Sequence, residues 1–309
     1  MSTLPVIVNP LAGGGRARLP IERLGRVAAE HGLRLELWPT EAPGHARALA
    51  EQAARDRLPM LAVWGGDGTY NEAAHGLLGS ATTLLVLPGG TSSVLAYELG
   101  IPRDPVKALC SQLDGEPRAM TVGRTDGGRI FLLMLSAGPD SLTLQHIPPR
   151  LKLHGGKVGI AAQALLEFMR GNLPRFEVAM NGERRPVSWC IAGNARRYGG
   201  PYVATPGADP FSPGFEVVLL ARHGRRATAR FFFAIPSGRH LGLRGVTHAP
   251  AQHVALLGEG VPYQLDGDAA GFLPVAARAG DERVQVRVPR PSHHADTKDS
   301  GHPRAGDQV

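Results

Sequence analysis

The stretch from Leu61 to Glu72, LAVWGGDGTYNE, constrains this chain most strongly. The apolar run Leu61–Trp64 is typical of a buried strand, and glycines with Asp67 among them follow it directly. Thr69 and Glu72 have the spacing of a capping box, which predicts that a helix follows. A strand, a glycine turn and a helix N-terminus together favour anion binding, because glycine permits close approach and the helix end presents free amides.

The acidic residue within this loop needs its own explanation. Asp67 would repel a phosphate group in direct contact, so we expect it to hold Mg²⁺ or the hydroxyl groups of a ligand. A simple strand-to-helix turn also uses glycines. The density of such residues at this one junction nevertheless favours a binding site.

Strands and helices alternate from the N-terminus to about residue 121. Apolar strand patterns at Leu4–Val8, Leu61–Trp64 and Thr83–Leu87 are each followed by a glycine-rich loop and a helical pattern. This alternation predicts an α/β domain with a parallel sheet, and such sheets bind ligands at the carboxyl ends of their strands. The three glycine-rich loops are therefore expected to converge on one site.

The pattern changes after residue 121. Residues 122–288 consist mainly of short apolar strands and turns, which predicts an all-β, sandwich-like second domain. The aromatic run Phe231–Ile235 is expected in the core, with an exposed patch that contacts lipid as the alternative. Residues 289–309 carry almost no apolar side chain and are expected to be a disordered tail. The chain thus divides into 1–121, 122–288 and 289–309.

Charge and cysteine content bear on partners and compartment. The formal net charge of +7 suits a nucleotide, anionic lipid or nucleic acid, but the basic residues look dispersed and no recognition motif is present, which argues against nucleic acid. Cys110 and Cys190 suit two reduced thiols in a cytoplasmic protein. No apolar run is long enough to cross a bilayer, so we expect any contact with an anionic membrane to be peripheral. A homodimer stays open.

Several blocks in the N-terminal half occur together in a known family. Gly65–Glu72 resembles the signature of the diacylglycerol kinase catalytic-domain superfamily, which includes bacterial lipid kinases and sphingosine kinases. Asn9-Pro10 with Gly13–Gly15 is similar to the first nucleotide loop of that family, and Pro88–Ala96 is similar to its third. The order of the blocks is more specific than any one of them.

The resemblance continues through the C-terminal half and covers about residues 4–288. Gly138 and Asp140 are similar to a glycine-acid segment that contacts the lipid headgroup in sphingosine kinases. Asp266-Gly267-Asp268 is similar to the element that carries the catalytic acid of the family. Without that context, an Asp-Gly-Asp sequence is a common surface turn.

The resemblance implies transfer of the γ-phosphoryl group of Mg-ATP to a lipid hydroxyl, either diacylglycerol-like or sphingoid. Either Asp266 or Asp268 would be the general base, while the other would hold metal or orient the base. Asp67 would organise the Mg²⁺ that ATP brings, and Asp140 would contact the lipid. The residues expected to bind the nucleotide are Asn9, Gly13, Arg16, Gly65, Gly66, Gly68, Thr69, Glu72, Gly90, Thr91, Ser92 and Ser93.

Two departures from the family pattern keep other functions open. Ser93 stands where the family usually has asparagine, and Pro213 stands where many bacterial lipid kinases have an aspartate that binds a structural Mg²⁺. Both departures leave room for a non-catalytic nucleotide- and lipid-binding protein of the same fold. An NAD kinase is disfavoured, because Asn71-Glu72 follows the glycine loop as in lipid kinases.

Overall fold

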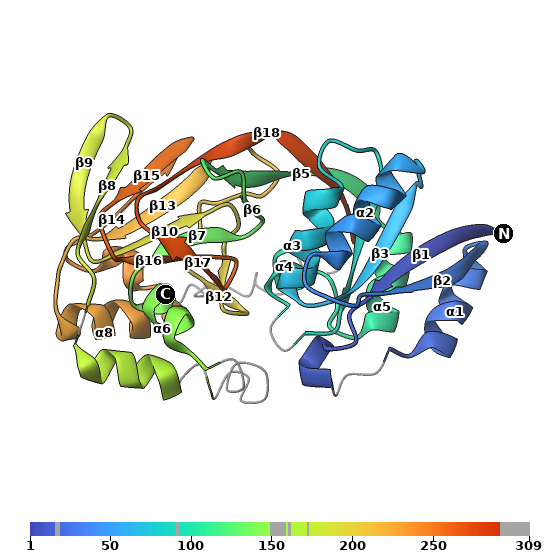
Figure 1. The fold of residues 1–309 in the computed structure, drawn as a ribbon, viewed down its shortest axis with the longest axis horizontal. Helices are drawn as coiled ribbons and strands as arrows, with labels where there is room; N and C mark the ends of the chain where they lie inside the picture. The colour runs from blue at the N-terminus through green and yellow to red at the C-terminus, as the bar shows by residue number, and fades with distance from the viewer. Residues whose placement is uncertain (16–18, 91–92, 149–158, 160–161, 172, 291–309) are drawn as a thin grey trace, which may run out of the picture.

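The fold was analysed in a computed structural model (Figure 1), which describes residues 1–15, 19–90, 93–148, 159, 162–171 and 173–290. The expected tail from residue 291 lies outside the described residues. Arg16, Thr91 and Ser92, all expected to bind nucleotide, also lie outside them.

The N-terminal part is an α/β domain. Its strands β2, β1, β3 and β4 pair in parallel in that order. Helices α1 and α5 pack together on one side of the sheet, and α2 and α3 pack together on the other (Figure 1). The elements are β1 (Ser2–Val8), α1 (Ile21–Glu30), β2 (Leu33–Pro39), α2 (His45–Arg55), β3 (Met60–Gly65), α3 (Asp67–Gly76), β4 (Thr83–Pro88), α4 (Val94–Glu98), α5 (Pro105–Leu113) and β5 (Glu116–Thr125).

The C-terminal part is an antiparallel β sandwich. One sheet has the order β14-β13-β10-β7-β16-β17, and the other is formed by β18, β15, β8 and β9. The elements are β6 (Ile130–Phe131), β7 (Met134–Ala137), α6 (Pro139–His146), a helix over 162–170, β8 (Phe176–Met180), β9 (Glu183–Val187), β10 (Trp189–Gly193), β11 (Arg197–Tyr198), β12 (Tyr202–Val203), β13 (Phe215–Leu220), α8 (Arg225–Ala234), two 3₁₀ turns (Ile235–Ser237 and His240–Gly242), β14 (Val246–Ala251), β15 (His253–Leu257), β16 (Pro262–Leu265), β17 (Asp268–Phe272) and β18 (Val275–Val288). The α/β and sandwich classes expected from the sequence are both confirmed.

The long strand β18 joins the two parts. Near its start it pairs with β15, whereas near its end Val286 pairs in parallel with Leu84 of β4 (Figure 1). The last residues of the sandwich portion therefore extend the N-terminal sheet. A division of the chain at residue 121 stays a prediction, because β4, which precedes this residue, pairs with β18, which follows it.

Two local predictions are wrong. The spacing of Thr69 and Glu72 does not form a capping box: α3 begins at Asp67 with Gly66 as its N-cap, and no side chain caps it. The aromatic run after Arg230 is not uniformly core, because it lies on α8 and only one side of a helix faces the interior. Hence Phe231 is buried while Phe232 and Phe233 are exposed.

Candidate active site

Two of the three glycine-rich loops are tied together through Asn9. This residue follows β1, and its Nδ2 atom donates a hydrogen bond to Oγ1 of Thr69 at 2.9 Å. Its Oδ1 atom accepts from the amide of Leu11 at 2.9 Å, which turns the chain into a short 3₁₀ segment containing Gly13. Asn9 thus shapes the first loop and anchors it to the start of α3.

The second and third loops touch backbone to backbone. The amide of Gly89 donates to the carbonyl of Gly65 at 2.9 Å. A β-carbon on Gly90 would lie 2.9 Å from Cα of Gly66, closer than real contacts allow. Glycine is therefore required here for the close approach of two loops, and the three strand ends lie together as the sequence predicted.

Asp67 is a buried helix cap. Its two carboxylate oxygens accept hydrogen bonds from the amides of Val94 and Leu95, each at 3.0 Å, at the start of α4. Burial raises the pKa of Asp67, against the lowering effect of these two amides. This side chain fixes the third loop relative to the second. Its expected role toward Mg²⁺ stays a prediction.

The side chain of Glu72 caps the N-terminus of α2. Its carboxylate accepts from the amides of Gly44 at 2.9 Å and Ala46 at 3.2 Å, at the N-terminus of α2. Acidic groups stabilise that end of a helix, because unpaired amides and the helix dipole meet there. In the structure Glu72 contacts protein amides, and its expected contact with nucleotide stays a prediction.

Ser93 lies at the N-cap of α4 in the left-handed region, with φ of 45°. Its side chain is buried, and the hydroxyl donates to the carbonyl of Gly90 at 3.4 Å. Asparagine adopts this backbone conformation more readily than serine. The asparagine that the family resemblance leads us to expect here would also suit this backbone, and Ser93 adopts the same conformation with a shorter side chain.

The segment Asp266-Gly267 forms the two-residue turn between β16 and β17. Both residues have positive φ, 52° and 90°, and Leu265 pairs with Asp268 across the turn. An Asp-Gly pair is the preferred sequence for such a hairpin. The turn gives the two aspartates different surroundings.

Asp266 points into the protein and binds four donors. Its Oδ1 accepts from the amides of Leu133 at 2.8 Å and Met134 at 3.0 Å, and its Oδ2 accepts from Leu132 at 2.7 Å and from Nδ2 of Asn71 at 2.8 Å. Burial raises the pKa of Asp266 to about 6, although these donors lower it. Since Asn71 belongs to α3, this carboxylate connects the two domains. That geometry favours a structural role for Asp266.

Asp268 is exposed and faces the second glycine loop. A β-carbon placed on Gly68 would lie 3.4 Å from Oδ2 of Asp268, an ordinary contact distance, so the carboxylate lies directly beside the backbone of Gly68. The carboxylate also lies close enough to Asp67 to raise the pKa of that buried acid. Asp268 therefore brings an accessible acidic group from the C-terminal domain to the N-terminus of α3.

Asp140 lies in the first turn of α6, in the C-terminal domain. Its Oδ2 accepts from the hydroxyl of Tyr198 at 3.1 Å and from Nε2 of Gln264 at 3.4 Å. Its Oδ1 is buried and has no hydrogen-bond partner among the described residues. Burial raises the pKa of Asp140. The Oδ1 atom is enclosed by protein, and the hydroxyl of Ser136 and the amide of Ser141 lie close enough to the carboxylate to lower its pKa.

Sequence reasoning missed two groups that position this site. Buried Gln264 donates to Asp140, and its Oε1 accepts from the amide of Gly267 at 2.7 Å, so it links the aspartate of α6 to the turn between β16 and β17. Glu98 of α4 accepts from Nε of Arg196 at 3.1 Å across the domain boundary. A polar residue inside the buried strand β16 was the available signal for Gln264.

Asp209 is an acidic neighbour of Pro213, where an aspartate of the family pattern would bind a structural metal. It accepts from the amide of Phe211 at 3.0 Å and from the hydroxyl of Ser212 at 2.7 Å. Its oxygens therefore shape a local turn. No group of three or more His, Cys, Asp or Glu side chains suited to a metal ion occurs among the described residues.

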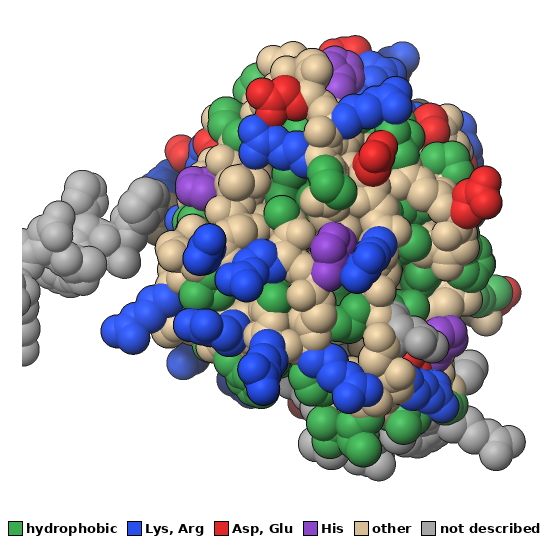
Figure 2. All heavy atoms as spheres, turned by 90° about the vertical axis from the view of Figure 1, so that its left-hand side faces the viewer, with side chains coloured by type: hydrophobic (Ala, Val, Ile, Leu, Met, Phe, Trp, Pro, Cys, Tyr) green, Lys and Arg blue, Asp and Glu red, His purple; other side chains and the backbone are tan. Residues whose placement is uncertain are grey.

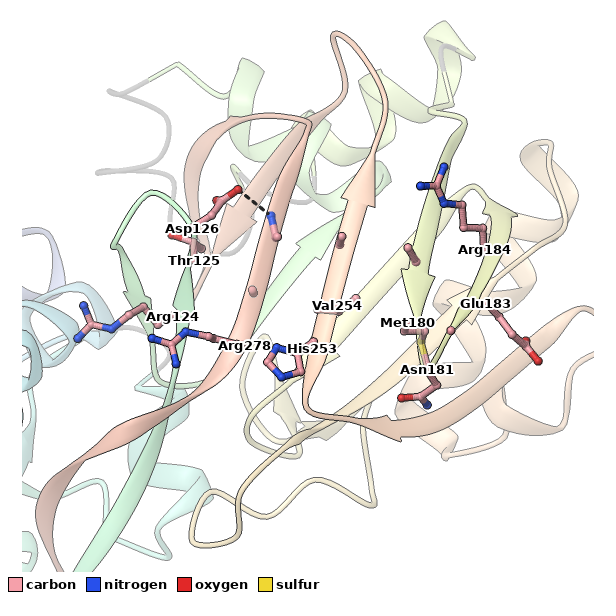
Figure 3. A pocket seen from close by; sticks show the side chains of 15 residues that line it. Arg124, Thr125, Asp126, Met180, Asn181, Glu183, Arg184, His253, Val254 and Arg278 are labelled. Atoms are coloured by element: carbon pink, nitrogen blue, oxygen red, sulfur yellow. Dashed lines mark hydrogen bonds between the residues drawn. The ribbon is translucent and has the colours of Figure 1, made fainter.

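A cavity of about 570 Å³ lies elsewhere, on the outer side of the sheet containing β8, β15 and β18 (Figure 3). None of the expected site residues lines it. Arg278 and Arg124 on its wall pair with acidic residues of β18, and Asp126 accepts from the amide of Ala276 at 3.3 Å (Figure 3). Its charges are largely paired within the protein.

Comparison with known families identifies the class of protein. Residues 3–125 match the model of the diacylglycerol kinase catalytic domain, and residues 134–288 match the YegS C-terminal NAD kinase beta sandwich-like domain. The two matches span most of the chain. It belongs to the family of diacylglycerol kinase-like lipid kinases.

Individual relatives agree with that assignment. A protein named diacylglycerol kinase from Mycobacterium tuberculosis is 28% identical over 301 residues, covering 92% of this chain and 94% of that protein. A probable lipid kinase YegS-like from Chromohalobacter salexigens is 31% identical over 225 residues, covering 69% and 70%. The crystal structure of a putative diacylglycerol kinase from Bacillus anthracis shares the fold, with a TM-score of 0.75 at 20% identity over 94% of this chain and 95% of that chain.

Proposed function

We propose that this protein is an ATP-dependent lipid kinase, which transfers the γ-phosphoryl group of Mg-ATP to the hydroxyl of a diacylglycerol-like or sphingoid lipid. The observation that carries the proposal is the approach of Asp268 to Gly68. It brings an exposed carboxylate to the end of a helix whose amides favour phosphate. Family membership supports the same reaction class.

The glycine loops would hold the nucleotide. Their backbones are free of β-carbons where they meet, and the N-terminus of α3 presents amides there. Mg²⁺ is commonly bound by one or two carboxylates together with substrate phosphates, and it neutralises charge during phosphoryl transfer. Asp268 fits such a role, or that of the base, because its exposed carboxylate lies beside the backbone of Gly68.

The acceptor would enter from the sandwich side. The carboxylate of Asp140 would accept a hydrogen bond from a lipid hydroxyl and thereby orient it. The carboxylate of Asp268 can then take the proton of the reacting hydroxyl as its oxygen bonds to the γ-phosphorus and the bond from that phosphorus to the leaving ADP oxygen breaks. Gln264 holds the two aspartates in fixed relation through its contacts with Asp140 and Gly267.

The acceptor is a membrane component, so we place the protein in the cytoplasm with reversible contact to an anionic membrane. No helix among the described residues is long and apolar enough to span a bilayer. Contact through basic residues should strengthen with anionic lipid and weaken with salt.

The test is transfer of radiolabel from ATP labelled in its γ-phosphoryl group into a panel of lipid extracts, with NAD as a parallel acceptor. Label in a lipid spot supports the proposal. Nucleotide binding without transfer to any lipid would point to the non-catalytic alternative, and label in NADP would point to an NAD kinase.

Asp140→Asn should raise the KM for lipid about 10- to 100-fold with a smaller change in kcat. A hydrogen bond to a charged group is worth about 1.5–3 kcal/mol, which corresponds to that range. Steady-state kinetics on dispersed lipid measures it, with Asp126→Asn as a control that makes the same charge change outside the candidate site. An unchanged KM would remove Asp140 from the lipid site.

A further inference from the structure

Positive charge is concentrated in one segment of the C-terminal domain. Residues 217–258 contain six arginines and no aspartate or glutamate, in a chain whose whole formal net charge is +7. Basic residues are spread along the whole chain, so the excess positive charge arises here because acidic residues are missing. The segment comprises most of β13 and all of α8, β14 and β15.

Four of these arginines line a cavity of about 260 Å³. The wall is formed at the start of α8 and by the segment preceding β14. The lining residues are Leu220, Arg222, His223, Arg226, Ala227, Arg230, Leu243 and Arg244, so none of the described residues that line it is acidic. Within the described part of the chain no salt bridge joins these arginines to an acidic side chain. This distinguishes the basic pocket from the charge-paired cavity of Figure 3.

The basic pocket is a defined feature of the fold. The stem of Arg222 passes over Gly245, where a β-carbon would lie 2.3 Å from its Cγ atom. Gly245 has φ of 86°, so two features of this position require glycine. Helix α8 begins beside Arg222 without a side-chain cap, and the positive end of the helix adds to the field of the arginines.

Exposed aromatic side chains lie next to the basic pocket on the same helix. Phe233 is seven residues after Arg226 and three after Arg230, which places the three on one side of α8. Phe233 is 75% exposed and Phe232 is 48% exposed, whereas Phe231 is 1% exposed and packs against Trp189 with ring centroids 5.1 Å apart. Of these three phenylalanines, Phe231 alone belongs to the hydrophobic core.

A second helix extends this apolar surface. In the helix over 162–170, Leu165, Leu166 and Met169 are exposed. Arg225 of α8 donates to the carbonyl of Met169, so the two helices are neighbours (Figure 1). Figure 2 faces this end of the domain and shows Lys and Arg side chains gathered beside hydrophobic ones.

We infer that α8 and the helix over 162–170 form a docking surface for an anionic membrane, in which the basic pocket takes lipid phosphate groups while Phe232 and Phe233 enter the interface. Arginine pairs well with phosphate, and a basic helix with aromatic side chains is suited to the headgroup boundary. Nucleic acid fits this surface less well, because exposed leucine and methionine side chains gain nothing from phosphate or base stacking.

The docking surface is connected to α6, the helix that carries Asp140. Glu167, on the helix over 162–170, contacts Nδ1 of His146 at 3.2 Å. His146 ends α6, and Asp140 is in the first turn of that same helix. This inference rests on the proposed function for its purpose, since a kinase of membrane lipids must bring its active site to the bilayer. The membrane binding itself requires no turnover.

The experiment is vesicle co-sedimentation of the whole chain without nucleotide. Vesicles of phosphatidylcholine alone are compared with vesicles of phosphatidylcholine and phosphatidylglycerol in equal parts, at low and high salt. Arg226→Glu with Arg230→Glu should weaken binding to the anionic vesicles about tenfold or more, because each arginine near such a surface contributes about 1 kcal/mol. Phe232→Ser with Phe233→Ser should weaken binding to both kinds of vesicle.

The matched control is Arg23→Glu with Arg26→Glu, the same charge change on exposed positions of α1 in the other domain. It should leave binding to anionic vesicles within about twofold of wild type, apart from the general effect of net charge. Circular dichroism and thermal unfolding establish that each variant is folded, and Arg226→Gln with Arg230→Gln replaces the reversal if that variant does not fold.

Two outcomes overturn the inference: undiminished binding of the folded α8 arginine variant to anionic vesicles, or an equal loss in the α1 control. Loss of binding to duplex DNA with vesicle binding intact also overturns it and assigns the surface to nucleic acid. Absence of phosphate transfer by a wild-type protein that binds vesicles as expected contradicts the kinase proposal instead.

Discussion

Asp268→Asn should lower kcat for phosphate transfer about 10²- to 10⁴-fold while leaving the fold intact. A positioned general base contributes a factor of that size, and asparagine cannot take the proton of the lipid hydroxyl. The side chain is exposed, so its replacement should change the free energy of unfolding by no more than about 0.5 kcal/mol. ATP affinity should stay near that of wild type, because the loop amides are unchanged.

Steady-state kinetics with saturating ATP and lipid measures this effect, and equilibrium binding of ATP provides the second readout. Asp281→Asn is the matched control, since Asp281 is an exposed aspartate of β18 that pairs only with Arg278 among the described residues. Normal turnover by Asp268→Asn would reduce the Asp-Gly-Asp turn to a surface hairpin and remove the catalytic assignment.

The signature GGDGTYNE is largely structural in its side chains. Asp67 caps α4, Glu72 caps α2, and Asn71 binds Asp266. The hydroxyl of Tyr70 donates to the carbonyl of Gly65 at 2.7 Å. These contacts hold three loops and two domains in register, which leaves the glycine backbone as the part of the motif suited to phosphate. Pre-organisation of that kind reduces the cost of ordering a site on binding.

The sheet and the meeting of the glycine loops at its edge could be predicted because both follow from local patterns. The apolar runs of β3 and β4 are almost wholly buried, and the glycines after them meet at the strand ends. The partners of individual polar side chains could not be predicted in this way. Asp266 and Leu132 are 134 residues apart in sequence, and no local pattern indicates that their atoms meet.

The docking surface could not be predicted from local sequence patterns either. A run of aromatic residues has no helical period of its own, so the sequence alone predicts burial for all of Phe231–Ile235. Once the run lies on a helix, successive side chains point about 100° apart and some must face solvent. The arginines that precede it then share a side with Phe233, which only the three-dimensional placement reveals.

Asp266→Ala should reduce the free energy of unfolding by about 3–5 kcal/mol, a large share of the stability of a typical domain. The change leaves three backbone amides and Nδ2 of Asn71 without their common acceptor, in a buried site. The sequence alone suggests a catalytic role for Asp266. The geometry instead predicts that activity falls together with stability.

Urea denaturation of wild type and variants measures the loss, and two graded variants keep the test informative if Asp266→Ala does not fold. Asp266→Asn retains one acceptor oxygen, so only the donors at the other oxygen lose their acceptor. Its loss of stability should therefore be smaller than that of Asp266→Ala. Asn71→Ala removes a single hydrogen bond to the carboxylate, together with one at 3.1 Å to the carbonyl of Ile130, and should cost about 1–3 kcal/mol. If Asp266→Ala unfolds at the same urea concentration as wild type but loses turnover, the structural assignment is wrong and Asp266 belongs to the chemistry.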